Sequence, residues 1–272
     1  MKVAQFRCNE FAENCFVAYD EATKDAFIVD PGMKYEQEWQ VVKDFVDSNS
    51  LKIGHVFLTH YHIDHILGTG RCAEAFGLGI TGSLEDSLSL LIPRMQAAMF
   101  GFDYDCKIAK VSNDVKEGDT LMCGSHRIEV IDCPGHSFHG LCYYLPEDKI
   151  LFTGDVLFYG SIGRSDFGPN MGCDGEKLVE GIKTKLMILP EDVTVFTGHG
   201  PKTSIAQEKL INPFYQMIKD PEILYSMVNM KLRDRYDSLE EYCYGEDVDR
   251  EEIESLLNGA GYFYNPETNQ FR

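Results

Sequence analysis

Four side chains able to bind a metal lie within six consecutive positions, in the segment HYHIDH at residues 60–65. The apolar run that precedes it predicts a strand, so His60 and His62 alternate to the same side and can share one ion. Asp64 and His65 turn into the next predicted helix and can reach a second ion. Such a density of ligands is hard to explain as packing, and it favours a metal site over a histidine-rich surface loop.

Three more ligand-type residues follow predicted strands further along the chain. His136 lies in DCPGHS, Asp155 in FTGDV and His199 in FTGHG. Each by itself could be an ordinary loop or strand-end residue. Together with the first segment they make five histidines and two aspartates, which suit zinc, iron or manganese alike. Because no cysteine is among them, an open catalytic site for two ions is favoured over a closed structural zinc site.

The remaining histidines carry weaker signals. His55 lies inside an apolar run and is expected to be a packing residue, while His126 precedes a strand and is expected to be exposed. His139 follows His136 by three residues, and it is either a packing residue or a support for the ligands.

The elements that must position the ligands are short strands and helices. Strands are predicted from alternating or apolar runs, over residues 3–7, 15–19, 26–30, 53–59, 78–81, 121–123, 127–131, 141–145, 150–153 and 193–197. Helices are predicted from helical spacing of apolar residues, over residues 35–46, from the histidine segment to 76, 84–100 with a break at Pro93, 176–189 and 203–210. Gly154 and Gly198 would let the backbone turn sharply before Asp155 and His199.

Composition excludes several classes of protein. The 272 residues include 25 Lys and Arg against 44 Asp and Glu, a net charge of −19, which argues against nucleic-acid partners and anionic membranes. No apolar run approaches the roughly 18 residues of a membrane span, and the N-terminal residues do not resemble a signal peptide. The nine cysteines are odd in number and form no CxxC pair. Reduced thiols in the cytoplasm are therefore expected.

The composition changes near residue 215. Residues 216–272 hold 13 Asp and Glu and 6 Lys and Arg, with predicted helices at 221–232, 238–243 and 249–258 and a hairpin at the end. We therefore expect a domain over residues 1–215 and an acidic helical extension over 216–272. A winged-helix-like cap fits this order of elements, but a packing appendage is favoured because the segment carries no basic surface.

The ligand pattern resembles that of the metallo-β-lactamase superfamily over about residues 2–215. Within it, the chain is most similar to the type II glyoxalases, or hydroxyacylglutathione hydrolase-like enzymes. The segments that carry this closer resemblance are Asn14-Cys15, VDPG at 29–32, GDVLF at 154–158, GRSDF at 163–167, GHGP at 198–201 and NPF at 212–214. The resemblance implies an α/β (α+β) fold, a four-layer αββα sandwich with the metals at one edge of the paired sheets and a mostly helical C-terminal extension.

The resemblance also implies a role for each ligand. It places the first ion on His60, His62 and His136, the second on Asp64, His65 and His199, and Asp155 between both. Flavodiiron-type members, which are similar in motif, have a carboxylate where His62 stands. Some β-lactamases have a cysteine where Asp155 stands. The implied cofactors are two divalent ions, with zinc favoured and iron or manganese left open.

The implied reaction is hydrolysis of a thioester. Two divalent ions lower the pKa of a bound water towards about 7, and the hydroxide attacks the carbonyl. A thiol leaves readily because its pKa is about 8.5. Asp64 is predicted to orient the water, and Arg164 to bind a carboxylate of the thiol carrier, unless Arg164 pairs with Asp166 or Asp174.

Three questions stay open at this point. The acidic extension does not align with the basic C-terminal region of larger type II glyoxalases, so glutathione is one carrier among several. The motif also resembles persulfide dioxygenases, which use one iron and dioxygen, and a non-enzymatic binding protein would keep the same fold. The expected partner is a small acyl-thiol, with no nucleic acid and no membrane, and a homo-oligomer is left open.

Overall fold

The computed structural model describes residues 1–216, 221–246 and 248–272, and the chain divides into two compact units, Met1–Lys209 and Leu210–Arg272. The domain boundary expected from the sequence is residue 215, and the division into units falls after Lys209. No helix among the described residues is long and apolar enough to cross a membrane.

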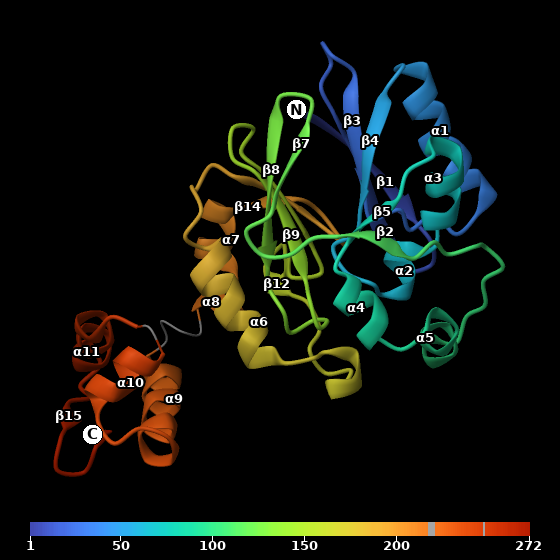
Figure 1. Cartoon of the computed structure of the whole chain (residues 1–272). Coiled ribbons are helices and arrows are strands. Elements are labelled where there is room, and N and C mark those ends of the chain that lie inside the picture. The colour runs from blue at the N-terminus through green and yellow to red at the C-terminus, as the bar shows by residue number, and fades with distance from the viewer. Residues whose placement is uncertain (217–220, 247) are drawn as a thin grey trace. The chain divides into compact units, whose positions relative to one another are not determined.

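Two six-stranded sheets form the centre of the first unit (Figure 1). The first sheet has the order β1-β2-β3-β4-β5-β6, with strands Lys2–Cys8, Glu13–Tyr19, Asp25–Val29, Lys52–Phe57, Ile80–Gly82 and Val111–Asp114. The second has the order β14-β13-β10-β9-β8-β7, with strands Thr203–Ser204, Thr194–Thr197, Ile150–Gly154, Leu141–Leu145, His126–Asp132 and Thr120–Cys123. A separate two-stranded ribbon is formed by β11 Leu157–Phe158 and β12 Ser161–Ile162.

Helices cover the outer faces of both sheets. Those associated with the first sheet are α1 Glu36–Ser48, α2 Ile63–Ile66, α3 Thr69–Phe76, α4 Leu84–Ser89 and α5 Pro93–Phe100. Those that follow the second sheet are a 3₁₀ turn Pro169–Met171, α6 Gly175–Gly181 with its π-helical continuation Ile182–Leu186, and α7 Ile205–Ile211. Figure 1 shows α1 and α3 on the outer side of the first sheet and α6 and α7 on that of the second. The unit is therefore the predicted αββα sandwich.

Strand alternation explains why the sheets are buried on both faces. In β2, Phe16 and Ala18 pack between the two sheets, whereas Cys15 and Val17 pack in the core that includes the helices. Successive side chains of a strand point to opposite faces, so one strand supplies both cores. The β2 strand accordingly has an almost continuous apolar sequence, as expected for a strand covered on both sides.

The observed sheets contain two strands that were not predicted, β6 and β14, and β14 occupies Thr203–Ser204 where the start of a helix was predicted. The predicted break at Pro93 is confirmed, because α4 ends at Ser89 and α5 begins at Pro93. The edge strand β6, with the sequence VSND, was not predicted, because Val111 is its only buried residue and the segment shows no apolar alternation. Its place is decided by parallel pairing with β5.

The second unit has its own small core. Its elements are α8 Pro213–Gln216, α9 Pro221–Asp234, α10 Leu239–Gly245, α11 Arg250–Gly259, β15 Tyr264–Asn265 and β16 Gln270–Phe271. The three longer helices and the terminal hairpin agree with the prediction. Phe271 is fully buried, and its backbone N–H and C=O bond the side chain of Asn229 at 2.7 and 2.9 Å. The hairpin is thereby fixed to α9.

Candidate metal centre

The predicted ligands follow the ends of strands at one edge of the sandwich. His60 comes after β4 of the first sheet, while Asp155 and His199 come after β10 and β13 of the second. Because β10 and β13 are parallel neighbours, their carboxyl ends meet at the same edge. His136 lies in the loop between β8 and β9. Tertiary structure thus brings together residues that are more than a hundred positions apart.

Gly154 allows the two sheets to approach each other beside the ligands. Its φ is +48°, and a Cβ built on it would lie 2.1 Å from the hydroxyl oxygen of Thr59. The Thr59 carbonyl in turn accepts a hydrogen bond from the N–H of Leu141 in the second sheet, at 2.8 Å. A side chain at residue 154 would therefore strain the backbone and separate the sheets where the site forms.

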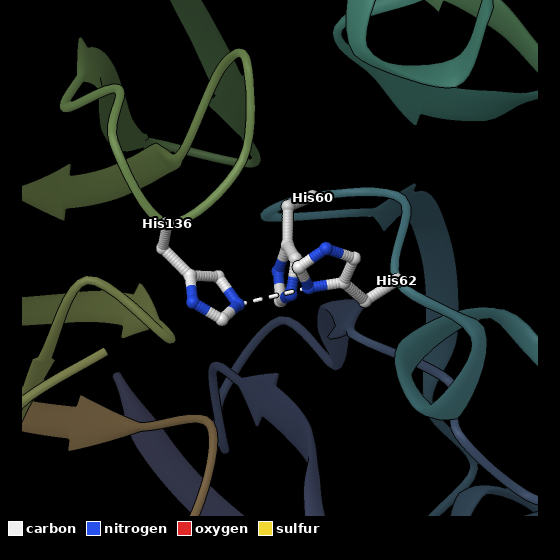
Figure 2. Close-up of side chains that lie close together, drawn as sticks. All are labelled: His60, His62 and His136. Atoms are coloured by element: carbon white, nitrogen blue, oxygen red, sulfur yellow. Dashed lines mark hydrogen bonds between the residues drawn. The ribbon is translucent and has the colours of Figure 1, made fainter. Parts of the chain in front are cut away.

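Three histidines meet on one side of the site (Figure 2). His60, His62 and His136 each offer a ring nitrogen, and these atoms lie within 4.8 Å of one another. The Nδ1 of His62 faces the Nε2 of His136 at 2.8 Å. This is the set that the resemblance assigned to the first ion.

A second set lies next to it, made of Asp64, His65 and His199 within the same 4.8 Å limit. The Nε2 of His199 lies 3.2 Å from Asp64. Asp155 lies between the two sets: its Oδ2 is 3.5 Å from both His136 and His199, and its Oδ1 is 3.4 Å from His65. The structure therefore brings all seven predicted ligands together, with Asp155 beside members of both sets.

Protein oxygens engage the outer nitrogens of four ligand histidines. The Nδ1 of His136 lies 2.7 Å from the carbonyl of Arg164, and that of His199 lies 3.0 Å from the carbonyl of Phe11. A carbonyl only accepts, so each Nδ1 carries a proton and each Nε2 is the ring nitrogen directed at the site.

The same holds for His60, whereas His65 pairs with the carboxylate of Asp30 without a hydrogen bond from its Nδ1 to any described residue. The Nδ1 of His60 faces the Thr59 hydroxyl at 3.0 Å, and that of His65 lies 3.1 Å from Asp30. The Thr59 hydroxyl donates to Asp30, so it accepts from His60.

The electrostatics of the two sets differ. Burial lowers the pKa of His62 to about 3, and burial together with neighbouring histidines holds the pKa of His60 well below its usual value. At the second set burial acts in the same direction, but Asp64 and Asp155 outweigh it and raise the pKa of His65 well above its usual value. The histidines of the first set are therefore neutral at pH 7 and can bind a cation, whereas those of the second set lie beside the carboxylates of Asp64 and Asp155.

These residues fit two divalent cations. Among the described residues, buried side-chain atoms without a hydrogen-bond partner include the Nε2 of His60, the Nε2 of His65 and the Oδ1 of Asp155. Buried polar atoms of this kind are costly unless something binds them. An ion would satisfy them, and the N and O donors suit zinc, iron or manganese. The side chains of Asp64, Asp155 and His199 are 14, 11 and 26% exposed, so the site opens to solvent on that side.

The predicted substrate residue Arg164 lies at the border of the site. Its carbonyl accepts from His136, but its guanidinium is exposed and makes a two-bond contact with Asp166, at 2.8 Å each. The guanidinium also lies over the ring of Phe167, 4.4 Å from its centre. The structure thus shows the pairing with Asp166 that the sequence left as an alternative, and a role in substrate binding stays a prediction.

Sequence reasoning gave no role to Asp30, which contacts the ligand His65 directly and the ligand His60 through Thr59. Its carboxylate accepts the N–H and the hydroxyl of Thr59, both at 2.7 Å, and faces His65 at 3.1 Å. The signal was present in the VDPG segment, because an aspartate between a buried strand and a proline has few reasons to be buried unless it is bonded. Glu13, also fully buried, lies 3.9 Å from His65 and went unnoticed for lack of any motif.

The other histidines lie outside the ligand sets. His55 bonds the carbonyl of Met122 at 3.0 Å and stacks on a phenylalanine ring, as expected for a packing residue. His126 is not exposed as expected: only 17% of its side chain is accessible, and it bonds Asp20 and Asp148 at 3.0 and 2.7 Å. Its position between two loops, one from each sheet, explains the difference.

Comparisons with known proteins agree with this geometry. The hydroxyacylglutathione hydrolase GloC of Haemophilus influenzae is 37% identical over 206 residues, which cover 75% of this chain and 93% of that protein. The crystal structure of BLEG-1 B3 metallo-β-lactamase matches with a TM-score of 0.70 and 30% identity, covering 79% of this chain and 99% of the other. The structure of TTHA1623 in a di-iron-bound form matches with a TM-score of 0.66 and 28% identity, covering 78% and 99%.

Family models match both parts of the chain. Residues 218–271 match a domain of unknown function (DUF4250), whose description assigns no activity. Residues 8–201 match the model described as metallo-beta-lactamase superfamily, and this range includes all seven ligands and strands β2 to β13. This chain therefore belongs to the metallo-β-lactamase superfamily and resembles its hydroxyacylglutathione hydrolases.

Proposed function

We propose that this protein is a dinuclear metal-dependent hydrolase that cleaves an acyl thioester, with zinc as the favoured metal. The observation that carries the proposal is the position of Asp155, which lies within 3.5 Å of ligands from both sets. The hydroxyacylglutathione hydrolase relative supports the choice of a thioester. The proposed partner is therefore a small acyl-thiol, and the nine unpaired cysteines support a reducing, cytoplasmic location.

The chain's own residues have distinct tasks in this proposal. When bound, divalent ions supply a water of lowered pKa and positive charge for the carbonyl oxygen. His60, His62 and His136 provide neutral nitrogens for one ion. Asp64 faces the open side of the site. Burial raises the pKa of the Asp64 carboxyl, but neighbouring His65 outweighs this effect and keeps that pKa low. The Asp64 carboxylate is therefore ionised and can accept a hydrogen bond from the attacking water.

The test combines metal analysis with a thioester panel. We expect two ions per chain and release of free thiol from lactoyl-glutathione or from an acyl ester of another small thiol, lost on dialysis against a chelator and restored by Zn²⁺. One iron per chain with oxygen consumption on a persulfide would replace the proposal with the dioxygenase alternative. A metal-free protein without thioesterase activity would leave only a binding role.

Arg164 provides a prediction about substrate recognition. If Arg164 binds a carboxylate of the thiol carrier, Arg164→Ala should raise KM roughly tenfold and change kcat little. The reason is that a contact far from the thioester carbonyl stabilises the bound substrate and the transition state equally. Arg164→Lys should recover only part of the loss, since an ammonium group lacks the planar fork. Steady-state kinetics on the hydrolysed thioester measure both constants.

Asp166 offers the matched control for Arg164. Asp166→Asn removes the charge that now pairs with the guanidinium, so it should leave KM unchanged or lower it. An unchanged KM in Arg164→Ala for every hydrolysed thioester would show that Arg164 and Asp166 form only a structural pair.

A further inference from the structure

The peptide groups on both sides of Tyr61 are held by two buried side chains. The Tyr61 N–H donates to the Oδ2 of Asp86 at 2.7 Å, and the Tyr61 C=O accepts from the Nε2 of Gln96 at 3.2 Å. Gln96 also accepts the N–H of Ile63 at 2.9 Å. Asp86 and Gln96 are 1% and 0% exposed and come from α4 and α5, the two helices separated at Pro93.

These contacts act on the metal ligands through the backbone. Tyr61 itself is 5% exposed and belongs to the core on the helix side, while its neighbours His60 and His62 face the site. Fixing the N–H and C=O of Tyr61 fixes the two peptide planes beside it, and with them the positions of the His60 and His62 Cα atoms relative to each other.

Asp86 reaches the other ligand loop as well. Its second oxygen, Oδ1, accepts the N–H of His139 at 3.0 Å, in the loop that carries His136. One carboxylate therefore joins the loop of His60 and His62 to the loop of His136. These three histidines are the members of the first metal set, and no ligand of the second set lies in the His136 loop.

We propose that Asp86 is a positioning residue for the first metal set, because its two oxygens hold the two ligand loops at a fixed separation. The inference depends on the metal centre and not on the thioester as substrate. Each oxygen accepts a different backbone N–H. Asparagine keeps the volume but has a single acceptor oxygen, so one of the two N–H groups would face an amide NH₂.

The carboxylate is not needed to form its own helix. Ser83 caps α4 by accepting the backbone N–H of Asp86 at 3.1 Å, and Asp114 accepts the N–H of Leu84 at 2.8 Å. Asp114→Asn is therefore a matched control: it makes the same substitution at a residue bonded to the same helix, but it touches neither ligand loop.

The test measures Zn²⁺ affinity by competition with a chromophoric chelator, in backgrounds that retain one set. In His199→Ala, which retains the first set, adding Asp86→Asn should weaken Zn²⁺ binding by about tenfold or more, as is usual when a residue supporting metal ligands is lost. In His136→Ala, which damages the first set, the same addition should change affinity less than about twofold. Asp114→Asn should change neither.

Several outcomes would overturn the proposal. Equal weakening in both backgrounds would mean general loosening, and an effect of Asp114→Asn equal to that of Asp86→Asn would mean that only helix stability matters. If Asp86→Asn fails to fold, amide hydrogen exchange in the metal-free wild type decides instead. The amides of Tyr61 and His139 should both be protected from exchange. Rapid exchange of either amide would contradict the proposal that Asp86 holds both loops.

Discussion

Asp155→Ala is expected to lose both metal ions and to lower kcat/KM for the thioester by about a thousandfold or more. The reason is geometric: its two oxygens lie within 3.5 Å of His136 in the first set and of His65 and His199 in the second. Without the carboxylate each set would keep three ligands, but the negative charge that would lie between the two proposed cations would be gone. Elemental analysis after dialysis, together with kinetics, measures both effects.

Two further variants make the Asp155 result specific. Asp155→Asn keeps the volume and one oxygen, so it should retain more metal than the alanine variant. His199→Ala should lose mainly the second ion, because that histidine belongs to one set. Two ions per chain in Asp155→Ala, at the occupancy of the wild type, would show that the residue does not bridge them.

Gly198→Ala should damage the same centre without removing any ligand. A Cβ at Gly198 would lie 2.2 Å from the Oδ1 of Asp155 and 2.9 Å from the Cε1 of His65. The backbone cannot retreat easily, because the Gly198 N–H donates to Gly154 at 2.7 Å and its C=O accepts from Asn14 at 2.8 Å. The ligands must therefore move, and we expect kcat/KM to fall by about a hundredfold, as for misplacements near 1 Å.

Gly54→Ala is the matched control for Gly198→Ala. Gly54 lies in β4, the strand that leads to His60, and a Cβ there would meet no atom closer than 3.8 Å. Its metal content and kinetics should equal those of the wild type. Gly198→Ala with two ions and normal kcat/KM would show that the site adapts to a methyl group, and that the approach of Gly198 to Asp155 is not required.

The ligand types and most of the elements were predictable from the sequence because they are local features. The alternation of His60 and His62 after an apolar run, and the repeated Thr-Gly before Asp155 and His199, are visible without a structure. Apolar spacing also predicted the strands of both sheets except β6 and β14. Each of these short strands is placed by pairing with a neighbour, β6 with β5 and β14 with β13, and not by its own side chains. The local sequence indicates the secondary-structure preference of a segment, whereas the pairing of an edge strand depends on the neighbouring strand.

The supports of the ligands could not be predicted, because they depend on residues distant in sequence. Asp86 and Gln96 act on Tyr61 from 25 and 35 positions away, and the carbonyl of Phe11 meets His199 across 188 positions. Every residue except proline has the same backbone N–H and C=O groups. A hydrogen bond to one of these groups therefore does not require a particular residue type at that position. A buried aspartate or glutamine in a helix therefore looks like any surface residue until the fold shows what it faces.

What the sequence by itself determined is the chemistry: five histidines and two aspartates at strand ends specify N and O ligands for divalent ions, and the apolar runs specify a sandwich of sheets and helices. What only the tertiary structure decided is how close those ligands lie to one another, with Asp155 beside members of both sets that the resemblance implied. The physical reason is that ligand type is a property of each side chain, whereas shared coordination depends on distances of a few ångströms. Those distances arise only when β4, β10 and β13 end at the same edge and Gly154 lets the two sheets approach.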